Sequence, residues 1–174
     1  MGSCSLTRYF MIKEMRDLEN LLQPFTGYVE LGMYEEANNE LENLPPEMKE
    51  HPMALLARLG LLVEMKCWKE GALLGESLCE LWPQELEFWF KTAYCQHELK
   101  LTAAAKETLL RAPALIQEIA VFYYNLACYE TQLGDLSEGR RLLEKSCEMD
   151  KHFGKDALGD PDLQPLWKGS TPAP

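Results

Sequence analysis

The sequence predicts an all-α fold, an α-α superhelix of about four helical hairpins closed by a C-terminal capping helix. Three observations support this fold class. Apolar residues recur at the 3.6-residue spacing of helices along most of the chain. Residues of related kind recur every 34 residues, which is typical of repeat architectures. Prolines gather where one predicted hairpin gives way to the next.

The repeat is visible when four short stretches are placed one above another. "ELGMYEEA" (30–37), "EMKCWKEG" (64–71), "ELKLTAAA" (98–105) and "QLGDLSEG" (132–139) align without a gap. One position, near the predicted turn between helices, holds Gly32, Lys66, Lys100 and Gly134. A small residue stands five positions later, as Ala37, Gly71, Ala105 and Gly139. A large apolar residue stands eleven positions before the turn, as Leu21, Leu55, Trp89 and Tyr123.

The first predicted unit, residues 18–51, contains a proline inside its first helical pattern. Because an interior proline breaks or bends a helix, two arrangements are open. Either a helix starts near Pro24 and residues 8–22 form a separate one, or a single helix bends there. Residues 1–17 are therefore an N-terminal segment or an extra helix, and "PPEMKEHP" (45–52) links this unit to the next.

The second unit, residues 52–85, follows the repeat pattern only in part, and the third unit, residues 86–119, follows it more closely. In the second unit, "LG" at 59–60 fits the repeat only after a slip of one residue. Pro83 suits the start of the third unit's first helix, where a missing N–H does no harm. Pro113 is expected to end or bend that unit's second helix.

The fourth unit, residues 120–153, gives the clearest hairpin. Apolar residues at 122, 123, 126, 129 and 133 lie on one helical face. Gly134 is expected to end this helix in the left-handed conformation, and Asp135 to cap the next one. Ala127 and Gly139 are expected where the two helices approach closely, since small side chains allow backbones to come together.

The ends of a repeat array need covers, because the outer hairpins would otherwise expose apolar faces. Residues 154–167 are expected to form a C-terminal cap, and residues 168–174 a disordered tail. The apolar side chains available to cover the last hairpin are Phe153, Leu158, Leu163, Leu166 and Trp167.

These features together resemble the tetratricopeptide repeat (TPR) family, whose unit is 34 residues long with small residues at fixed positions. The resemblance covers residues 18–153 and is best in the fourth unit. It implies a TPR solenoid whose first helices line a concave groove. The tail is similar to those that follow TPR units in small bacterial proteins.

Composition excludes several classes of function. With 28 acidic and 17 basic residues, the net charge of −11 repels phosphate backbones, so no nucleic-acid partner is expected. No apolar run is long enough for a membrane span, and the N-terminus has no secretory signal. The six cysteines include no Cys-x-x-Cys pair, so we expect no metal site and a reducing, cytoplasmic location.

No set of residues in the sequence predicts catalysis. Gly-rich phosphate loops and hydrolase motifs are missing from the sequence. Cys95 and His97 are the one conceivable nucleophile pair, but residues two apart on a helix point to different faces. We therefore expect neither an enzyme nor a cofactor.

The TPR resemblance implies which side chains face the groove. Carried over by position, they are Leu22, Thr26 and Val29, then Leu56, Gly60 and Val63, then Phe90, Lys91, Tyr94 and His97, and finally Tyr124, Asn125, Cys128 and Thr131. TPR domains that clamp acidic tails use basic and amide side chains here, and only Lys91 and Asn125 match. The predicted partner is instead a protein or peptide with apolar or aromatic anchors and basic flanks.

Several alternatives stay open at this stage. Phe90, Tyr94 and Tyr124 can pack against one another instead of binding a partner. The apolar and basic residues 6–16 can fill the groove themselves. The exposed ends of the array can pair, giving a homo-oligomer. The chain can also be a dedicated small acidic chaperone for a secreted or assembled client, which predicts that the client aggregates without it.

Overall fold

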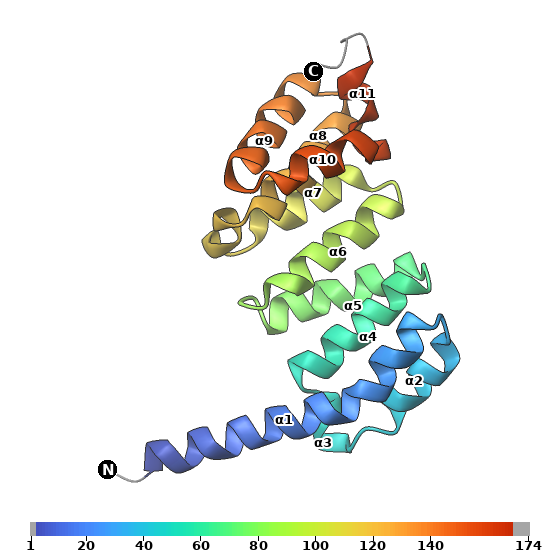
Figure 1. Cartoon of the computed structure of the whole chain (residues 1–174), viewed down its shortest axis with the longest axis vertical. Coiled ribbons are helices and arrows are strands. Elements are labelled where there is room, and N and C mark those ends of the chain that lie inside the picture. Colours follow the sequence, from blue (N-terminus) through green and yellow to red (C-terminus); the bar gives the residue numbers. More distant parts are fainter. Residues whose placement is uncertain (1–2, 169–174) are drawn as a thin grey trace. The chain divides into compact units, whose positions relative to one another are not determined.

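The computed structural model describes the backbone of residues 3–168 and the side chains of residues 15–168, and every regular element in that part of the chain is a helix (Figure 1). The chain divides into two compact units, Met1–Cys67 and Trp68–Pro174. The first unit contains α1 (Ser3–Glu30), α2 (Tyr34–Glu42), α3 (Pro46–Lys49) and α4 (Pro52–Glu64). The second contains α5 (Trp68–Leu81), α6 (Leu86–Glu98), α7 (Thr102–Arg111), η1 (Ala114–Glu118), α8 (Ala120–Leu133), α9 (Leu136–Met149), α10 (His152–Gly159), η2 (Pro161–Leu163) and α11 (Gln164–Trp167).

Helix α1 runs through Pro24 as one element, so the first unit does not begin with two separate helices. The side chain of Pro24 is exposed, while Leu18, Leu22 and Phe25 are buried at helical spacing. Leu21, the large residue of the repeat, is 41% exposed, and the buried stripe of α1 uses Leu22 instead. The predicted groove-filling segment 6–16 lies mostly outside the described side chains.

The core of the first unit joins three helices. The α1 stripe packs with Ala37 and Leu41 of α2 and with Ala54 and Leu61 of α4, together with Leu44 from the connection after α2. Apolar side chains on one face of each helix thus leave water together, which is the main favourable contribution to folding.

Four turns at 34-residue intervals share one backbone conformation. Gly32, Lys66, Lys100 and Gly134 have φ values of 69°, 57°, 65° and 96°. Each turn carries the same pair of bonds. At Lys100, its N–H donates to the His97 carbonyl at 2.8 Å, and the next N–H, from Leu101, donates to the Gln96 carbonyl at 2.9 Å. This is the Schellman ending of a helix, which favours glycine because L side chains clash in the left-handed region.

The fourth-unit hairpin agrees with the sequence in its local details. Gly134 ends α8 in the left-handed conformation, and the Asp135 carboxylate accepts a bond from the Glu138 N–H at 3.0 Å. Pro113 follows the end of α7 at Arg111, as predicted. Pro83, in contrast, lies three residues before the start of α6 at Leu86 rather than opening it, and its carbonyl accepts the hydrogen bond of the Trp89 indole at 2.9 Å.

Close helix approaches in the second unit pair a glycine with a threonine. The small residues Gly71, Ala105 and Gly139 are all buried, as is Ala37 in the first unit. A Cβ added at Gly139 would lie 3.3 Å from the Ala127 carbonyl and against Thr131, so this glycine does mark the contact of α9 with α8. Gly75 of α5 is a second such point, because an added Cβ would lie 3.0 Å from Thr92 Cβ on α6.

The C-terminal cap packs against α8 and α9 through fewer apolar side chains than the sequence suggests. Leu163 and Leu166 are fully buried, and the Arg140 guanidinium donates to the Leu166 carbonyl. Leu158, predicted to cover the last hairpin, is exposed, because the buried position of α10 is taken by Ala157. Of the predicted disordered tail, residues 169–174 lie outside the described part of the chain.

Within the described residues, no helix combines the length and the apolar character needed to cross a bilayer.

Candidate functional site

The predicted groove residues of the third and fourth units lie on α6 and α8, and a segment of the C-terminal cap lies against part of them (Figure 1). We call this surface the groove face; it comprises Phe90, Lys91, Tyr94, His97, Tyr124, Cys128 and Gln132. We call residues 160–163 the strap. The rings of His97 on α6 and Tyr129 on α8 lie 5.0 Å apart, which joins the two helices at this point.

Asp160 anchors the first part of the strap to α8. Its Oδ2 accepts a hydrogen bond from the Tyr124 hydroxyl at 2.7 Å and another from the Cys128 thiol at 3.6 Å. Its Oδ1 accepts the Asp162 N–H at 2.9 Å and so fixes the turn. Burial, followed by the Asp160 carboxylate, raises the pKa of both Tyr124 and Cys128, which therefore remain protonated donors at neutral pH.

Asp162 joins the strap to α6 and α8 together. Its Oδ2 lies 3.0 Å from His97 Nε2, and its backbone carbonyl accepts the Gln132 amide at 2.7 Å. The other ring nitrogen of His97 lies 3.0 Å from the Thr102 hydroxyl, so this buried imidazole has a partner at both nitrogens. The hydrogen bond from His97 lowers the pKa of Asp162 below its ordinary value, against the opposing effect of burial.

The N-terminal part of α6 stays open within the second unit. Tyr94 is 44% exposed, and its ring meets that of Trp68 edge to face with centroids 5.6 Å apart. Phe90 lies half-buried one turn before Tyr94. Lys91, one of the two matches to a basic groove, lies 4.0 Å from the Glu87 carboxylate.

The remaining predicted groove residues are distributed differently. Thr131 is buried, and its hydroxyl donates to the Ala127 carbonyl at 2.7 Å beside Gly139, so it faces α9. Asn125 is half-buried on α8. In the first unit Leu22 belongs to the core, and the exposed Thr26 donates to its carbonyl at 3.2 Å. The other predicted groove residues of this unit are half-buried, namely Val29, Leu56, Gly60 and Val63.

Sequence reasoning missed the strap as part of the site. The residues "DPD" (160–162) indicate a turn, which is correct locally, because Asp160 caps η2. The partners of the strap are 65 residues away in the case of His97 and 36 in the case of Tyr124. A resemblance to single repeat units cannot reveal such contacts, since the strap lies outside the repeats.

The cysteines and histidine of this region are placed for packing. Cys95 is fully buried, and burial raises its pKa to about 11, so it is a thiol and not a thiolate at neutral pH. His97 is directed to Asp162 and Thr102 instead of Cys95. Within residues 15–168 no three His, Cys, Asp or Glu side chains gather as ligands for a metal ion.

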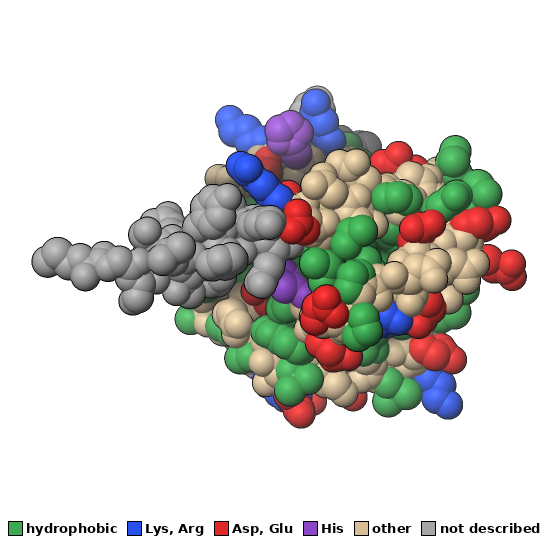
Figure 2. Space-filling model, turned by 90° about the horizontal axis from the view of Figure 1, so that it is seen from below, with side chains coloured by type: hydrophobic (Ala, Val, Ile, Leu, Met, Phe, Trp, Pro, Cys, Tyr) green, Lys and Arg blue, Asp and Glu red, His purple; other side chains and the backbone are tan. Residues whose placement is uncertain are grey.

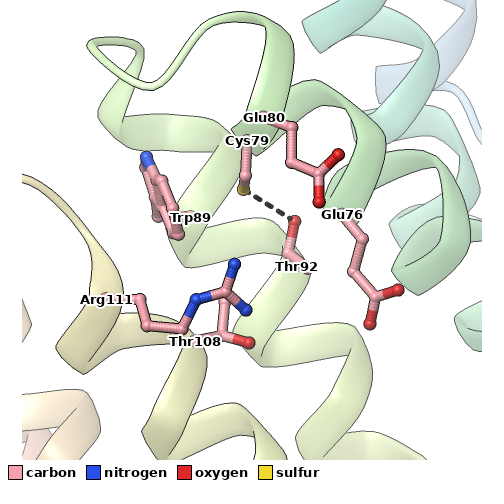
Figure 3. Close-up of a pocket in the computed structure, with 7 residues that line it drawn as sticks. All are labelled: Glu76, Cys79, Glu80, Trp89, Thr92, Thr108 and Arg111. Atoms are coloured by element: carbon pink, nitrogen blue, oxygen red, sulfur yellow. Dashed lines mark hydrogen bonds between the residues drawn. The ribbon is translucent and has the colours of Figure 1, made fainter.

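A small pocket lies between α5, α6 and α7 (Figure 3). Its volume is about 90 Å³, and its lining includes the carboxylates of Glu76 and Glu80 and the Arg111 guanidinium. Among its lining residues, the Cys79 sulfur lies 3.6 Å from the Thr92 hydroxyl, and burial raises the pKa of Cys79 to about 11. Cofactor sites usually enclose roughly 300 Å³ or more, so this pocket suits a few waters or the end of one side chain.

The surface is predominantly acidic. Figure 2 shows acidic side chains spread among apolar ones over the face that it draws, in keeping with the net charge of −11. Such a field attracts basic partners and discourages acidic ones at long range.

Comparison with known proteins shows the fold. No family model and no curated protein matches the chain. Among solved structures, MamA 41-end from Desulfovibrio magneticus RS-1 superimposes with a TM-score of 0.65 at 16% identity, covering 86% of this chain and 89% of that chain. At this level of identity the likeness concerns the fold alone, an all-α, α-α superhelix of TPR-like helical repeats.

Proposed function

We propose that the chain is a non-catalytic interaction module that holds a protein or peptide segment at the open part of the groove face. The observation that carries this proposal is the pair of Trp68 and Tyr94, whose rings meet at 5.6 Å while Tyr94 keeps 44% of its surface in water. Aromatic side chains at a protein surface are frequent anchors, because they bury much area at a small loss of conformational freedom.

The charges around this pair support the predicted chemistry of the partner. The exposed Glu87 and the half-buried Glu98 lie on α6, and Glu98 follows Tyr94 by one turn. An apolar or aromatic anchor from the partner would cover Tyr94 and Phe90. Basic residues beside that anchor would meet the carboxylates, and the net charge of −11 would speed the encounter.

The buried thiols support the expected location of the chain. Cys79, Cys95 and Cys128 are free and buried in the second unit. Because such thiols persist where glutathione keeps cysteines reduced, we include a cytoplasmic location in the proposal.

Affinity capture from a native lysate, followed by quantitative mass spectrometry, tests the proposal. Tyr94→Ser should reduce the captured partner at least about tenfold, the effect of losing a central anchor. Leu115→Ser is the matched control, because Leu115 is also apolar and exposed but lies in η1. Equal capture by the wild-type chain and Tyr94→Ser would contradict the proposal. So would a fall of many degrees in the melting temperature of Tyr94→Ser, which would make Tyr94 a packing residue.

The identity of the captured protein decides between scaffold and chaperone. A client that aggregates when this chain is removed, and stays in solution when it is supplied, would make the function that of a dedicated chaperone. A partner that is stable by itself would make it that of a scaffold.

A further inference from the structure

The side chains that α6 and α8 direct toward the strap are hydrogen-bond donors. The Tyr124 hydroxyl, the Cys128 thiol and the Gln132 amide each donate to an oxygen of Asp160 or Asp162. An ionised Asp162 carboxylate can only accept, so His97 Nε2 carries its hydrogen toward it at 3.0 Å. This part of the groove face is therefore arranged to receive carboxylate and carbonyl oxygens.

Four donors on α6 and α8 are arranged to fit two carboxylates and one carbonyl at short range. With the strap in place, His97 is 4% exposed, Cys128 is buried and Tyr124 is half-buried. With the strap removed, water would reach these donors. A second segment would be favoured over water because its carboxylates, placed as those of the strap are, form charge-assisted hydrogen bonds with the same donors.

The strap is a short 3-10 turn between α10 and α11. The Leu163 N–H donates to the Asp160 carbonyl at 3.2 Å, the Gln164 N–H donates to the Pro161 carbonyl, and Asp160 Oδ1 accepts the Asp162 N–H. It follows the exposed Gly159, and it inserts one apolar side chain, Leu163, which is fully buried. The segment thus presents two carboxylates separated by one residue, followed directly by leucine.

We propose that the strap is an internal ligand of the groove face, and that a partner segment of the same chemistry, Asp-x-Asp-Leu, replaces it. This proposal rests on the proposed function, since it concerns the second half of the same surface. The net charge of −11 disfavours an acidic segment at long range, and the donors of α6 and α8 oppose this effect at contact. It adds a partner motif and a means of regulation. While the strap is bound, the donors of α6 and α8 are occupied, and only the open part around Tyr94 is available.

A labelled peptide with the sequence of residues 156–167, DALGDPDLQPLW, tests the proposal in fluorescence anisotropy with the purified full chain. The Asp160→Asn/Asp162→Asn chain, whose own strap has lost its charges, should bind this peptide at least about tenfold more tightly than the wild-type chain, because a closed site reduces apparent affinity by the fraction that is open. The peptide DALGNPNLQPLW should bind neither chain measurably.

Two controls separate this effect from others. Glu144→Gln/Glu148→Gln removes the same number of charges from exposed positions of α9 and should leave peptide binding at the wild-type level. Leu115→Ser in the strap variant should also leave it unchanged, and capture of the lysate partner by Tyr94→Ser is measured separately, so a failure of the proposed function and a failure of this inference are distinguishable. Equal affinity of the wild-type and strap-variant chains for DALGDPDLQPLW, or no binding by a folded strap variant, would overturn the proposal.

If the strap variant does not fold, hydrogen exchange of the wild-type chain tests whether the strap opens locally. The Asp162 and Leu163 amides should exchange at least about tenfold faster than the core amides of α8, through local opening of the strap. Exchange of all these amides at one common rate would show that the strap opens only with global unfolding, and the proposal would be wrong.

Discussion

Replacing Lys66 or Lys100 with glycine should stabilise the protein. Both lysines occupy left-handed turns, with φ of 57° and 65°, at the positions where Gly32 and Gly134 stand in the other two turns. For a residue with a Cβ this conformation costs about 1–2 kcal/mol. Glycine avoids this strain, but it offsets roughly 0.5–1 kcal/mol of the gain, because a glycine has more conformational freedom to lose when the unfolded chain folds. The net gain in free energy of unfolding should be about 0.5–1 kcal/mol per site.

The lysine side chains contribute little that would be lost. Both are exposed, and no hydrogen bond or ion pair of either side chain is found within the described residues. Lys100 makes one minor contribution, a long-range attraction that helps to lower the pKa of Asp162. Lys66 is therefore the cleaner site, and its replacement should give the larger gain of the two.

Thermal unfolding followed by circular dichroism measures the effect. For a chain of 174 residues, each glycine should raise the melting temperature by about 1–4 °C. Lys66→Ala is the matched control, since it removes the charge but retains a Cβ, and it should give no gain. In the reverse direction, Gly134→Ala should lower stability by about 1–2 kcal/mol. A lower melting temperature for Lys66→Gly, or no effect of Gly134→Ala, would refute the reasoning.

Three other substitutions test the packing and charge of the second unit by urea unfolding. Gly75→Ala should destabilise this unit by about 1–3 kcal/mol, although alanine favours helices, because the new Cβ would clash with Thr92 of α6. Thr92→Ala in the same chain should restore part of the lost stability, and full additivity of the two changes in free energy would contradict the proposed clash. Asp162→Asn should remove a pH-dependent contribution. The pKa of this carboxyl in the folded protein is below its ordinary value of 3.8, so the stabilisation that it gives is present above that pH and is lost as pH falls through the folded pKa. The difference in free energy of unfolding between the wild-type chain and Asp162→Asn should therefore narrow in acid. A constant difference from pH 6 to pH 2 would count against this contribution. Lys106→Met should lower the free energy of unfolding by about 1–3 kcal/mol, because the carboxylate of Glu130, 8% exposed, lies 2.6 Å from the ammonium and would lose its charge partner. Glu130→Gln in the same chain should recover part of this loss. An unchanged urea midpoint for Lys106→Met would show that the pair contributes nothing.

The sequence predicts features that depend on neighbouring residues. The left-handed end of α8 at Gly134 and the cap at Asp135 follow from residues adjacent in the chain, and both are present. The close contact at Gly139 also follows, because few other reasons favour glycine inside a helix. The 34-residue spacing extends the same turn to Lys66 and Lys100, where residue type alone gives no indication of it.

Features that depend on distant packing could not be predicted in this way. The shift from Leu21 to Leu22 in α1 depends on which face α2 and α4 cover, and both leucines suit a helix equally. The pairing of His97 with Asp162 spans 65 residues and joins a repeat to a segment outside it. Most side chains of the candidate site on α6 and α8 were therefore predicted from their positions in the repeat, while the strap that covers part of them was found only in the structure.

The even spacing of the left-handed turns also limits how this gene can change in length. One residue inserted inside α8, between Ala120 and Leu133, would rotate every later side chain of that helix by about 100°, since a helix has 3.6 residues per turn. Duplication of a whole stretch of the repeat length would preserve every orientation. Viable relatives of this protein should therefore differ by multiples of that length where helices are gained or lost, and by single residues only in the connections between helices.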